Sequence, residues 1–405
     1  MKTVIISPYQ IFVNGHALGG GGIRQYWVAK YLSEKGHDVT LVMLRRRAQA
    51  KTETTFMRIR TVEPNPIYTT YRGSLRLTLR KMGWHRDLFF LCDPYFTAAV
   101  YPYVKDADVV LPFFFGAAYP SLYASKLART PIIFTDVDVE CLKLFQFSKI
   151  KGVEKISTLG IYFLMVAEKA SCNLADVVVV QRPEEEDFLR KIGVSKPVEV
   201  IPNGVDTDYF KPLDHDACKE IVKSRHDISS KFLVFFHGTL MYEPNVDALN
   251  LINQHIAPEI TKKGLDVTFI IAGSEPPIYM KFHRNVRYIG FVRDLPVYIN
   301  AADACIIPLR VGGGVSNKAL EYLACGRPTV STKVGVRGIE VENGLHCLVT
   351  EGMDGDFVNT LIQVLNERRD FETLGRNAVE LAKERYSWSK IGERYEKVIK
   401  SLTSL

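Results

Sequence analysis

Short apolar runs alternate with longer helical patterns along most of this 405-residue chain. The run KTVIIS at 2–7 is followed by a glycine-rich turn, a helical pattern that ends at Gly36, and a second apolar run, HDVTLVML, at 37–44. Strand, helix and strand in this order are typical of the βαβ unit of a parallel sheet. Later runs such as ADVVLPFF and ADVVVVQ are apolar on both faces, as in buried strands of such sheets. We therefore expect an α/β protein.

The length of the chain predicts two domains, because 405 residues exceed what one ordinary core accommodates. The alternating pattern starts again after residue 230. The stretch 202–230 is rich in Pro, Asp, Asn and Lys and shows little periodicity, so we expect the linker there. We place one Rossmann-like, doubly wound domain at 1–204 and a second at 205–385.

The composition is that of a soluble globular protein, with 47% hydrophobic and 24% charged residues. A formal net charge of +7 favours an anionic ligand or an anionic membrane surface over nucleic acid, although ordinary surface charge explains it equally well. The seven cysteines are scattered without a CxxC pair, which indicates a reducing compartment and no zinc site. The first residues are typical of a strand and not of a signal peptide, and the longest apolar stretch, at 159–167, is too short to span a membrane. We expect a cytoplasmic protein.

The segment 44–90 does not follow the alternation of apolar runs and helical patterns seen in the rest of the chain. On a helix, Arg72, Arg76 and Arg80 would form one stripe beside Leu75 and Leu79. One interpretation is a basic amphipathic patch that lies on an anionic membrane, at the inner face of the cell membrane. The alternative is a solvated helix that packs its leucines on its own sheet.

Two glycine-rich loops precede helical patterns, at 19–22 and at 312–314. The first N–H groups of a helix and its dipole favour an anion at such a place. In a dinucleotide-binding protein, an acidic residue would follow the second strand, but here VTLVML runs into three arginines. A nicotinamide or flavin enzyme is therefore disfavoured.

An ordered set of segments resembles the GT-B glycosyltransferases of the large retaining family often called family 4. The segments are GGGGIRQYWVAKYLSEKGHDVTLV at 19–42, VEVIPNGVDTDYFKP at 198–212, FFHGTLMYEPNVDALNLI at 235–252, FIIAGSEPP at 269–277, the stretch 286–332 with GGGVSNKALEYLACGRPTV, and ERYSWSKIGERYEKV at 384–398. The resemblance implies two Rossmann-like domains that face a cleft, with the final helix, 386–405, crossing back to complete the first domain. It also implies that the C-terminal domain holds a nucleoside diphosphate sugar.

The loop at 312–314 and the helix after it carry the implied donor site. Glu321 would accept hydrogen bonds from both ribose hydroxyls, with a charge that complements the helix dipole as the alternative. Arg310 and Lys318 would neutralise the diphosphate without a metal, unless they are ordinary surface charges. Further donor contacts are expected from the remaining positions, namely Gly21, Gly22, Gly238, the backbone of Phe291 and Val292 at the base, Gly313, the amides of Gly314, Val315 and Ser316, and Asn317.

Two departures from the family pattern concern the sugar. Gly313 stands where relatives often have a first glutamate, so the loop resembles a subgroup with GGG in that place. The segment TPIIFTDVDVECLKLF lacks the histidine that many members have there and carries Asp136, Asp138 and Glu140. We select Asp138 as the acid that contacts the acceptor or the sugar, with a helix-capping role as the alternative.

We expect a retaining transfer of a sugar from a nucleoside diphosphate sugar to an acceptor hydroxyl, in the synthesis of a glycan, glycolipid or cell-surface polysaccharide. No metal or other cofactor is expected. The alternatives are a GT-B epimerase or hydrolase, and a non-catalytic subunit that binds a nucleotide sugar. The sequence names neither the nucleotide, the sugar nor the acceptor.

Overall fold

The computed structural model describes residues 1–8, 12–13, 16–17, 19–44, 56–62, 94–147, 158–274, 276, 280–352, 355–367 and 371–403, without the side chains of 12–13, 16–17, 19–20 and 146–147. These residues form two compact units, Met1–Asn203 with Trp388–Leu405, and Gly204–Ser387. Most of the segment 44–90, where the sequence suggests a membrane-binding helix, lies outside the described residues. No helix of the described part is both long and apolar enough to cross a membrane.

The N-terminal unit is built on parallel strands. Its strands are β1 (Lys2–Ser7), β4 (Asp38–Leu44), β5 (Arg58–Val62), β6 (Val109–Pro112), β7 (Ile133–Thr135), β8 (Val177–Val180) and β9 (Val198–Val200), with a short hairpin of β2 (Phe12–Val13) and β3 (His16–Ala17). The sheet β5-β4-β1-β6 continues through parallel bridges of Val110 with Ile132 and of Phe113 with Thr135 into the sheet β7-β8-β9. This arrangement confirms the parallel α/β pattern read from the sequence.

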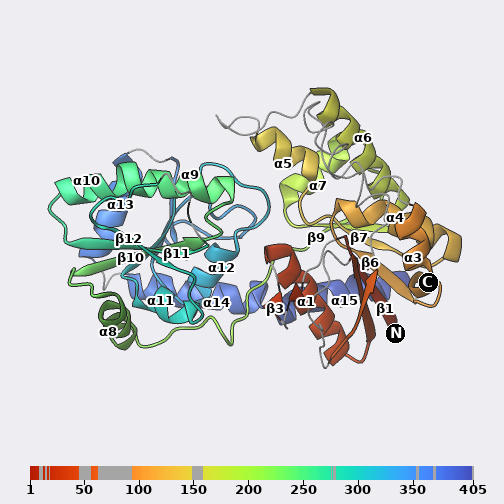
Figure 1. Cartoon of the computed structure of the whole chain (residues 1–405), viewed down its shortest axis with the longest axis horizontal. Helices are drawn as coiled ribbons and strands as arrows, with labels where there is room; N and C mark the ends of the chain where they lie inside the picture. The colour runs from red at the N-terminus through yellow and green to blue at the C-terminus, as the bar shows by residue number, and fades with distance from the viewer. Residues whose placement is uncertain are drawn as a thin grey trace. The chain divides into compact units, whose positions relative to one another are not determined.

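Helices cover both faces of this sheet (Figure 1). They are α1 (Gly19–Glu34), α3 (Pro94–Val104), α4 (Phe115–Ala128), α5 (Glu140–Phe147), α6 (Thr158–Leu174), α7 (Pro183–Lys191) and α15 (Trp388–Thr403). Successive residues of β1 enter different cores: Val4 and Ile6 pack with α3, α4 and α6, whereas Ile5 packs with α1 and α15. Both faces are therefore buried, which is why these strands read as continuous apolar runs.

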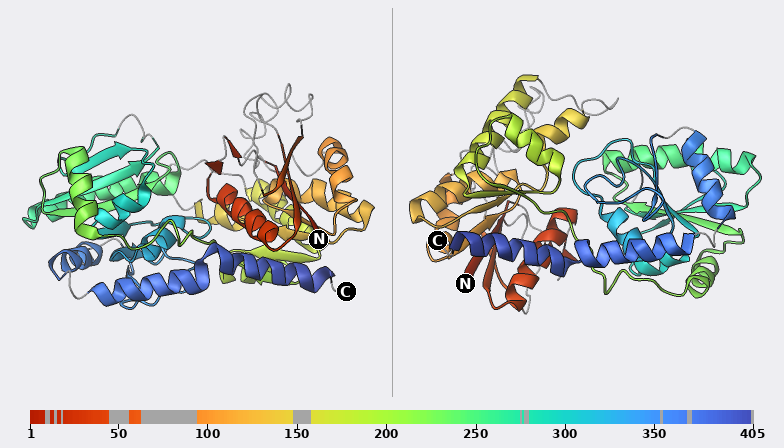
Figure 2. Two further views of the ribbon diagram at one scale, coloured as in Figure 1. Left: turned by 90° about the horizontal axis from the view of Figure 1, so that it is seen from below. Right: turned by 180° about the vertical axis from the view of Figure 1, so that it is seen from behind.

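The last helix, α15, completes the N-terminal unit by packing on α1 (Figure 2). A Cβ on Gly392 would lie 2.1 Å from Cγ of Tyr31, so a side chain at that position would collide with the ring. Arg24 of α1 is fully buried and its guanidinium donates to the carbonyls of Ile201 and Pro202 and to the Tyr395 hydroxyl. Sequence position 388 onward thus returns to the first unit, as the resemblance implies.

The C-terminal unit holds a six-stranded parallel sheet in the order β12-β11-β10-β13-β14-β15. The strands are β10 (Phe232–Gly238), β11 (Val267–Gly273), β12 (Val286–Gly290), β13 (Ala304–Ile307), β14 (Thr329–Thr332) and β15 (Leu348–Thr350). The helices are α8 (His215–His226), α9 (Glu243–Leu251), a π-helical turn η2 (Ile252–Ile256), α10 (Ala257–Lys262), α11 (Leu295–Ala301), α12 (Asn317–Ala324), α13 (Gly355–Asn366) and α14 (Glu372–Tyr386). Helices α9, α10 and α13 lie on one side of the sheet and α8, α11 and α14 on the other (Figure 1).

The sequence predicts a linker over 202–230, and this is wrong for its second half, where α8 forms. Asp214 caps the helix by accepting a hydrogen bond from the Ala217 amide at 2.7 Å. Cys218 and Val222 are the two side chains that α8 buries. Because only two of the 12 residues of this mostly polar helix are buried, its amphipathic pattern in the sequence is weak.

Candidate functional site

The glycine loop at 312–314 leads from β13 directly into the N-terminus of α12. Gly314 has φ of +37°, in the left-handed region that favours glycine. Ser316 is the N-cap residue and makes no side-chain capping hydrogen bond. The Ala319 amide donates to the Ser316 carbonyl at 3.1 Å, which closes the first turn of α12. The N–H groups and the dipole at the start of a helix favour an anion there. The loop therefore has the geometry that the sequence predicts for residues 313–317, while their contacts with a donor stay a prediction.

Lys318, in the first turn of α12, is buried, with 8% of its surface exposed. Its Nζ donates a hydrogen bond of 2.6 Å to Oδ1 of Asn245 and lies 4.7 Å from the centre of the Phe236 ring. Burial lowers the pKa of Lys318 to about 8, and the negative charge of Glu321 opposes this shift. Lys318 is therefore not an ordinary surface charge.

Glu321 lies one turn further along α12, and its side chain is 15% exposed. Its Oε2 is 3.0 Å from Nε2 of His237, at the end of β10. The two atoms make a close contact without the alignment of a hydrogen bond, and among the described residues Oε2 has no hydrogen-bond partner. A buried carboxylate oxygen without a hydrogen-bond partner can accept a hydrogen bond from a ligand hydroxyl.

Arg310 differs from Lys318 in its surroundings. Its Nε donates to Oδ2 of Asp247 at 2.9 Å, and its Nη2 donates to the other oxygen of the same carboxylate. This two-bond contact raises the pKa of the Arg310 guanidinium. More than half of the Arg310 side chain is exposed. The Arg310 guanidinium, which the sequence predicts to bind the diphosphate, is thus already paired with a carboxylate of α9.

Gly238 ends β10, and its lack of a side chain has a local cause. A Cβ at this position would lie 2.7 Å from Nδ2 of Asn245, and a Cβ on Gly273, which has φ of +143°, would lie 1.9 Å from the Gly238 carbonyl oxygen. The ends of β10 and β11 therefore approach closely enough to exclude side chains. Phe291 and Val292 follow β12, and Phe291 is 80% exposed.

Three polar residues that hold these groups are not predicted from the sequence. His237, Asn245 and Asp247 come from β10 and α9, and they contact Glu321, Lys318 and Arg310 respectively. All three lie inside the segment FFHGTLMYEPNVDALNLI, which the sequence analysis uses only as a family signal. Their contacts in α12 and the preceding loop are 63 to 84 positions away in the sequence, so no local pattern points to them.

In the N-terminal unit, Asp138 lies between β7 and α5. Its Oδ2 is 3.5 Å from Nζ of Lys143, which also donates to Glu140 at 2.6 Å. Burial raises the pKa of Asp138, and the Lys143 charge opposes the shift. The helix-capping role is filled by Glu168, whose carboxylate accepts from the amides of Glu140 at 2.6 Å and of Cys141 at 3.2 Å.

The first glycine loop is part of α1, which begins at Gly19, so Gly21 and Gly22 lie in the first turn of the helix. A Cβ on Gly21 would lie 2.2 Å from Cζ of Phe114. Gly21 is therefore explained in part by packing against an aromatic ring, independently of any ligand. Its predicted donor contact stays a prediction, as does that of Gly22.

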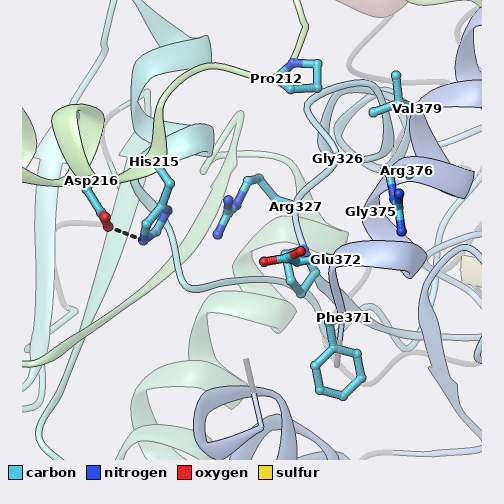
Figure 3. Close-up of a pocket in the computed structure, with 11 residues that line it drawn as sticks. Pro212, His215, Asp216, Gly326, Arg327, Phe371, Glu372, Gly375, Arg376 and Val379 are labelled. Carbon is cyan, nitrogen blue, oxygen red and sulfur yellow. Dashed lines mark ion pairs between the residues drawn. The ribbon is translucent and has the colours of Figure 1, made fainter. Parts of the chain in front are cut away.

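A cavity of about 740 Å³ lies in the C-terminal unit, at the end of α12 opposite to the glycine loop. Figure 3 shows residues that line it. Arg327 lies between His215 and Glu372 in this view, and Nε2 of His215 is 3.8 Å from Oδ1 of Asp216. The described residues that line this cavity include none of those selected from the sequence. Its charges are mixed, so it does not resemble a site for an anion.

The comparisons with known proteins fit this geometry. A family model described as Glycosyltransferase Family 4 matches residues 18–209, and one described as Glycosyl transferases group 1 matches residues 231–367. Among solved structures, the sucrose-phosphate synthase of Thermosynechococcus elongatus has a TM-score of 0.74 at 16% identity and covers 100% of both chains. HepE of Anabaena, in complex with UDP, has a TM-score of 0.72 at 16% identity, also over 100% of both chains. The chain belongs to the GT-B glycosyltransferases.

Sequence relatives of this GT-B glycosyltransferase are enzymes that act on different acceptors. It is 27% identical over 247 residues to a GDP-mannose-dependent alpha-(1-6)-phosphatidylinositol monomannoside mannosyltransferase of Mycolicibacterium smegmatis, which covers 56% of this chain and 63% of the relative. It is also 27% identical to a D-inositol 3-phosphate glycosyltransferase of Catenulispora acidiphila, over 56% of each chain. The chain thus matches little more than half the length of these relatives.

Proposed function

We propose that this protein transfers a sugar from a nucleoside diphosphate sugar to an acceptor hydroxyl, with retention of configuration at the anomeric carbon. One observation carries the proposal. Helix α12 presents a buried ammonium, Lys318, and a partly buried carboxylate, Glu321, one turn apart behind a glycine loop, and Oε2 of Glu321 lacks a hydrogen-bond partner among the described residues. A nucleoside diphosphate offers the complementary groups, two ribose hydroxyls and a diphosphate.

In the proposed complex, Glu321 accepts from the ribose hydroxyls, and Lys318 with the amides of Gly314, Val315 and Ser316 binds the diphosphate. The base lies against Phe291 and Val292. The structurally similar HepE was solved with UDP and with UDP-glucose, which supports a donor of this class. We propose that these groups neutralise the diphosphate without a metal ion, so that a chelator leaves the activity unchanged.

The reaction breaks the bond between the anomeric carbon and the diphosphate oxygen while the acceptor oxygen bonds to the same face of that carbon. The electron pair of the broken bond stays on the diphosphate, where the Lys318 ammonium and the loop amides stabilise it. The acceptor proton passes to a diphosphate oxygen. The protein contributes mainly the positions of the two substrates and this electrostatic stabilisation.

Asp138 is our proposed contact on the acceptor or sugar side. Its burial raises its pKa, so the ionised form, which is the stronger acceptor for a hydroxyl, is reached at a higher pH than for an exposed aspartate. Because Gly313 offers no carboxylate, the sugar hydroxyls would be read by backbone amides or by Asn317. We therefore propose no particular sugar.

We further propose that the acceptor belongs to glycan, glycolipid or cell-surface polysaccharide synthesis, and that the protein contacts an anionic membrane at its cytoplasmic face. Leu159, Tyr162 and Val166 form an exposed apolar stripe on α6. Three lysines precede this helix in the sequence SKIKGVEKIS. Binding to phosphatidylglycerol vesicles that weakens with salt supports the proposal, and equal binding to neutral phosphatidylcholine vesicles contradicts it.

The test of the reaction is a product analysis with a panel of nucleotide sugars, with and without a hydroxyl acceptor. Transfer with retention supports the proposal. Free sugar as the product even with acceptor present identifies a hydrolase, and interconversion of the donor identifies an epimerase. Tight donor binding without turnover identifies a non-catalytic subunit. The variant Asp138→Asn should lower the rate of transfer while donor affinity stays unchanged.

A further inference from the structure

Asn245 joins two parts of the candidate site that are far apart in the sequence. It lies in the first turn of α9 and is 7% exposed. Its Oδ1 accepts from Nζ of Lys318 at 2.6 Å, and its Nδ2 donates to the carbonyl of Thr239 at 3.0 Å. The side-chain oxygen of Asn245 therefore contacts the lysine, and its side-chain nitrogen contacts the turn after β10.

Both ends of this amide are fixed in place. Thr239 follows Gly238, where a side chain would collide with Nδ2 of Asn245. The Asn245 backbone amide donates to the carbonyl of Tyr242 at 2.8 Å, which ties the residue to the start of α9. With Nδ2 held by Thr239, Oδ1 is left to face Lys318. The orientation of the amide is thus set by the fold and not by the lysine.

The surroundings of Lys318 give Asn245 a large effect on the ammonium. The Phe236 ring from β10 lies over Nζ, and an aromatic face provides less solvation than water. The charged group that acts on it is Glu321 on its own helix, which also contacts His237 of β10. Asp247 on α9 is paired with Arg310. A neutral amide oxygen solvates the ammonium and leaves its positive charge in place. A carboxylate in the same position would cancel that charge.

We propose that Asn245 is a positioning residue of the donor site, which holds the Lys318 ammonium in its charged form at the place where the donor diphosphate binds. This inference rests on the proposed function. Asn245 need not touch the donor for this role. An aspartate in its place would pair with the lysine and compete with the diphosphate, and an apolar residue would leave the ammonium without its acceptor.

The experiment measures the affinity of the full chain for UDP, GDP and ADP as a function of pH, by isothermal titration. For the tightest-binding nucleotide, wild-type affinity should fall as the pH rises above about 8, because Lys318 loses its proton there. In Asn245→Leu, which has nearly the same shape, the fall should begin at lower pH, because the ammonium has lost its hydrogen-bond acceptor. Affinity at neutral pH should drop about tenfold.

Three further variants separate positioning from folding. Asn245→Asp should move the alkaline fall to higher pH and still weaken binding, because the new carboxylate offsets the charge. Lys318→Met should show no alkaline fall. Asn173→Leu, the same replacement at a distant asparagine that bonds Ser195, should leave the pH profile unchanged.

A purely structural role for Asn245 would lower the thermal midpoint of Asn245→Leu without moving the pH at which affinity falls, and that result overturns the inference. A wild-type protein that binds none of the three nucleotides contradicts the proposed function instead. The two failures are therefore distinguishable.

Discussion

Nε2 of His237 lies 3.0 Å from Oε2 of Glu321, although 84 positions separate the two residues in the sequence. The imidazole ring is held from two sides, stacked near Phe235 and edge-on to Tyr322. The backbone amide of His237 also donates to the Tyr322 hydroxyl at 3.2 Å. Because the ring is fixed, it limits the positions that the Glu321 carboxylate can take.

This contact predicts the behaviour of His237→Phe, which keeps an aromatic ring and removes the nitrogen. Nucleotide affinity should fall by about three- to tenfold, because Glu321 loses the group that orients it but keeps its charge. Isothermal titration with the tightest-binding nucleoside diphosphate measures the effect. A loss as large as that of removing Glu321 itself would show that the imidazole binds the nucleotide directly.

Arg24 predicts a specific requirement for arginine in the N-terminal unit. Its guanidinium is fully buried and donates to the carbonyls of Ile201 and Pro202, to Asn203 and to the Tyr395 hydroxyl. A lysine cannot reach these acceptors together. Arg24→Lys should lower the free energy of unfolding by about 3 kcal/mol, because buried acceptors lose their donors.

The matched control for Arg24 is Arg58→Lys, the same replacement in an exposed pair with Asp38. This change should stay within about 0.5 kcal/mol in urea unfolding. Equal effects of the two replacements would contradict the role assigned to Arg24.

Gly392 tests the packing of α15 on α1. A methyl group at this position would meet Cγ of Tyr31, the atom nearest the backbone of that ring, which cannot easily move away. Gly392→Ala should cost about 1–3 kcal/mol of stability even though alanine favours a helix. Gly355→Ala, at the start of α13 with no atom within 4 Å of its Cβ, serves as the control and should not destabilise the protein. Thermal unfolding of both variants measures the difference.

Asp303 predicts how stability changes in acid. Burial would raise the pKa of this carboxyl, but His215, Lys219 and the Leu233 amide hold it at about 2. Since the folded pKa lies below the unfolded value of about 4, the contribution is complete above pH 4 and is lost as the pH falls toward 2. Asp303→Asn should therefore lose about 2 kcal/mol at neutral pH and much less near pH 2. A difference from wild type that does not change with pH would contradict this assignment.

The sequence was sufficient for the strands, the glycine loop and the spacing of Lys318 and Glu321 on one helix, because these depend on local pattern. It did not reveal the partners of the two residues. Asn245 and His237 reach α12 only because β10 and β13 pair in parallel, and such a contact leaves no local signal. Arg310 shows the same limit, because its carboxylate partner, Asp247, is 63 positions away. Charged residues can be found from the sequence, whereas the side chains that pair with them in the fold cannot.

In the proposed donor complex, Glu321 binds the ribose of a nucleoside diphosphate. Isothermal titration of wild type, Glu321→Ala and the exposed control Glu380→Ala with UDP, GDP and ADP tests it most directly. We expect wild type and Glu380→Ala to bind the same nucleotide equally well, while Glu321→Ala loses about 100-fold in affinity or more, because two hydrogen bonds to a charged acceptor are removed. Unchanged affinity in Glu321→Ala would show that Glu321 does not bind the nucleotide.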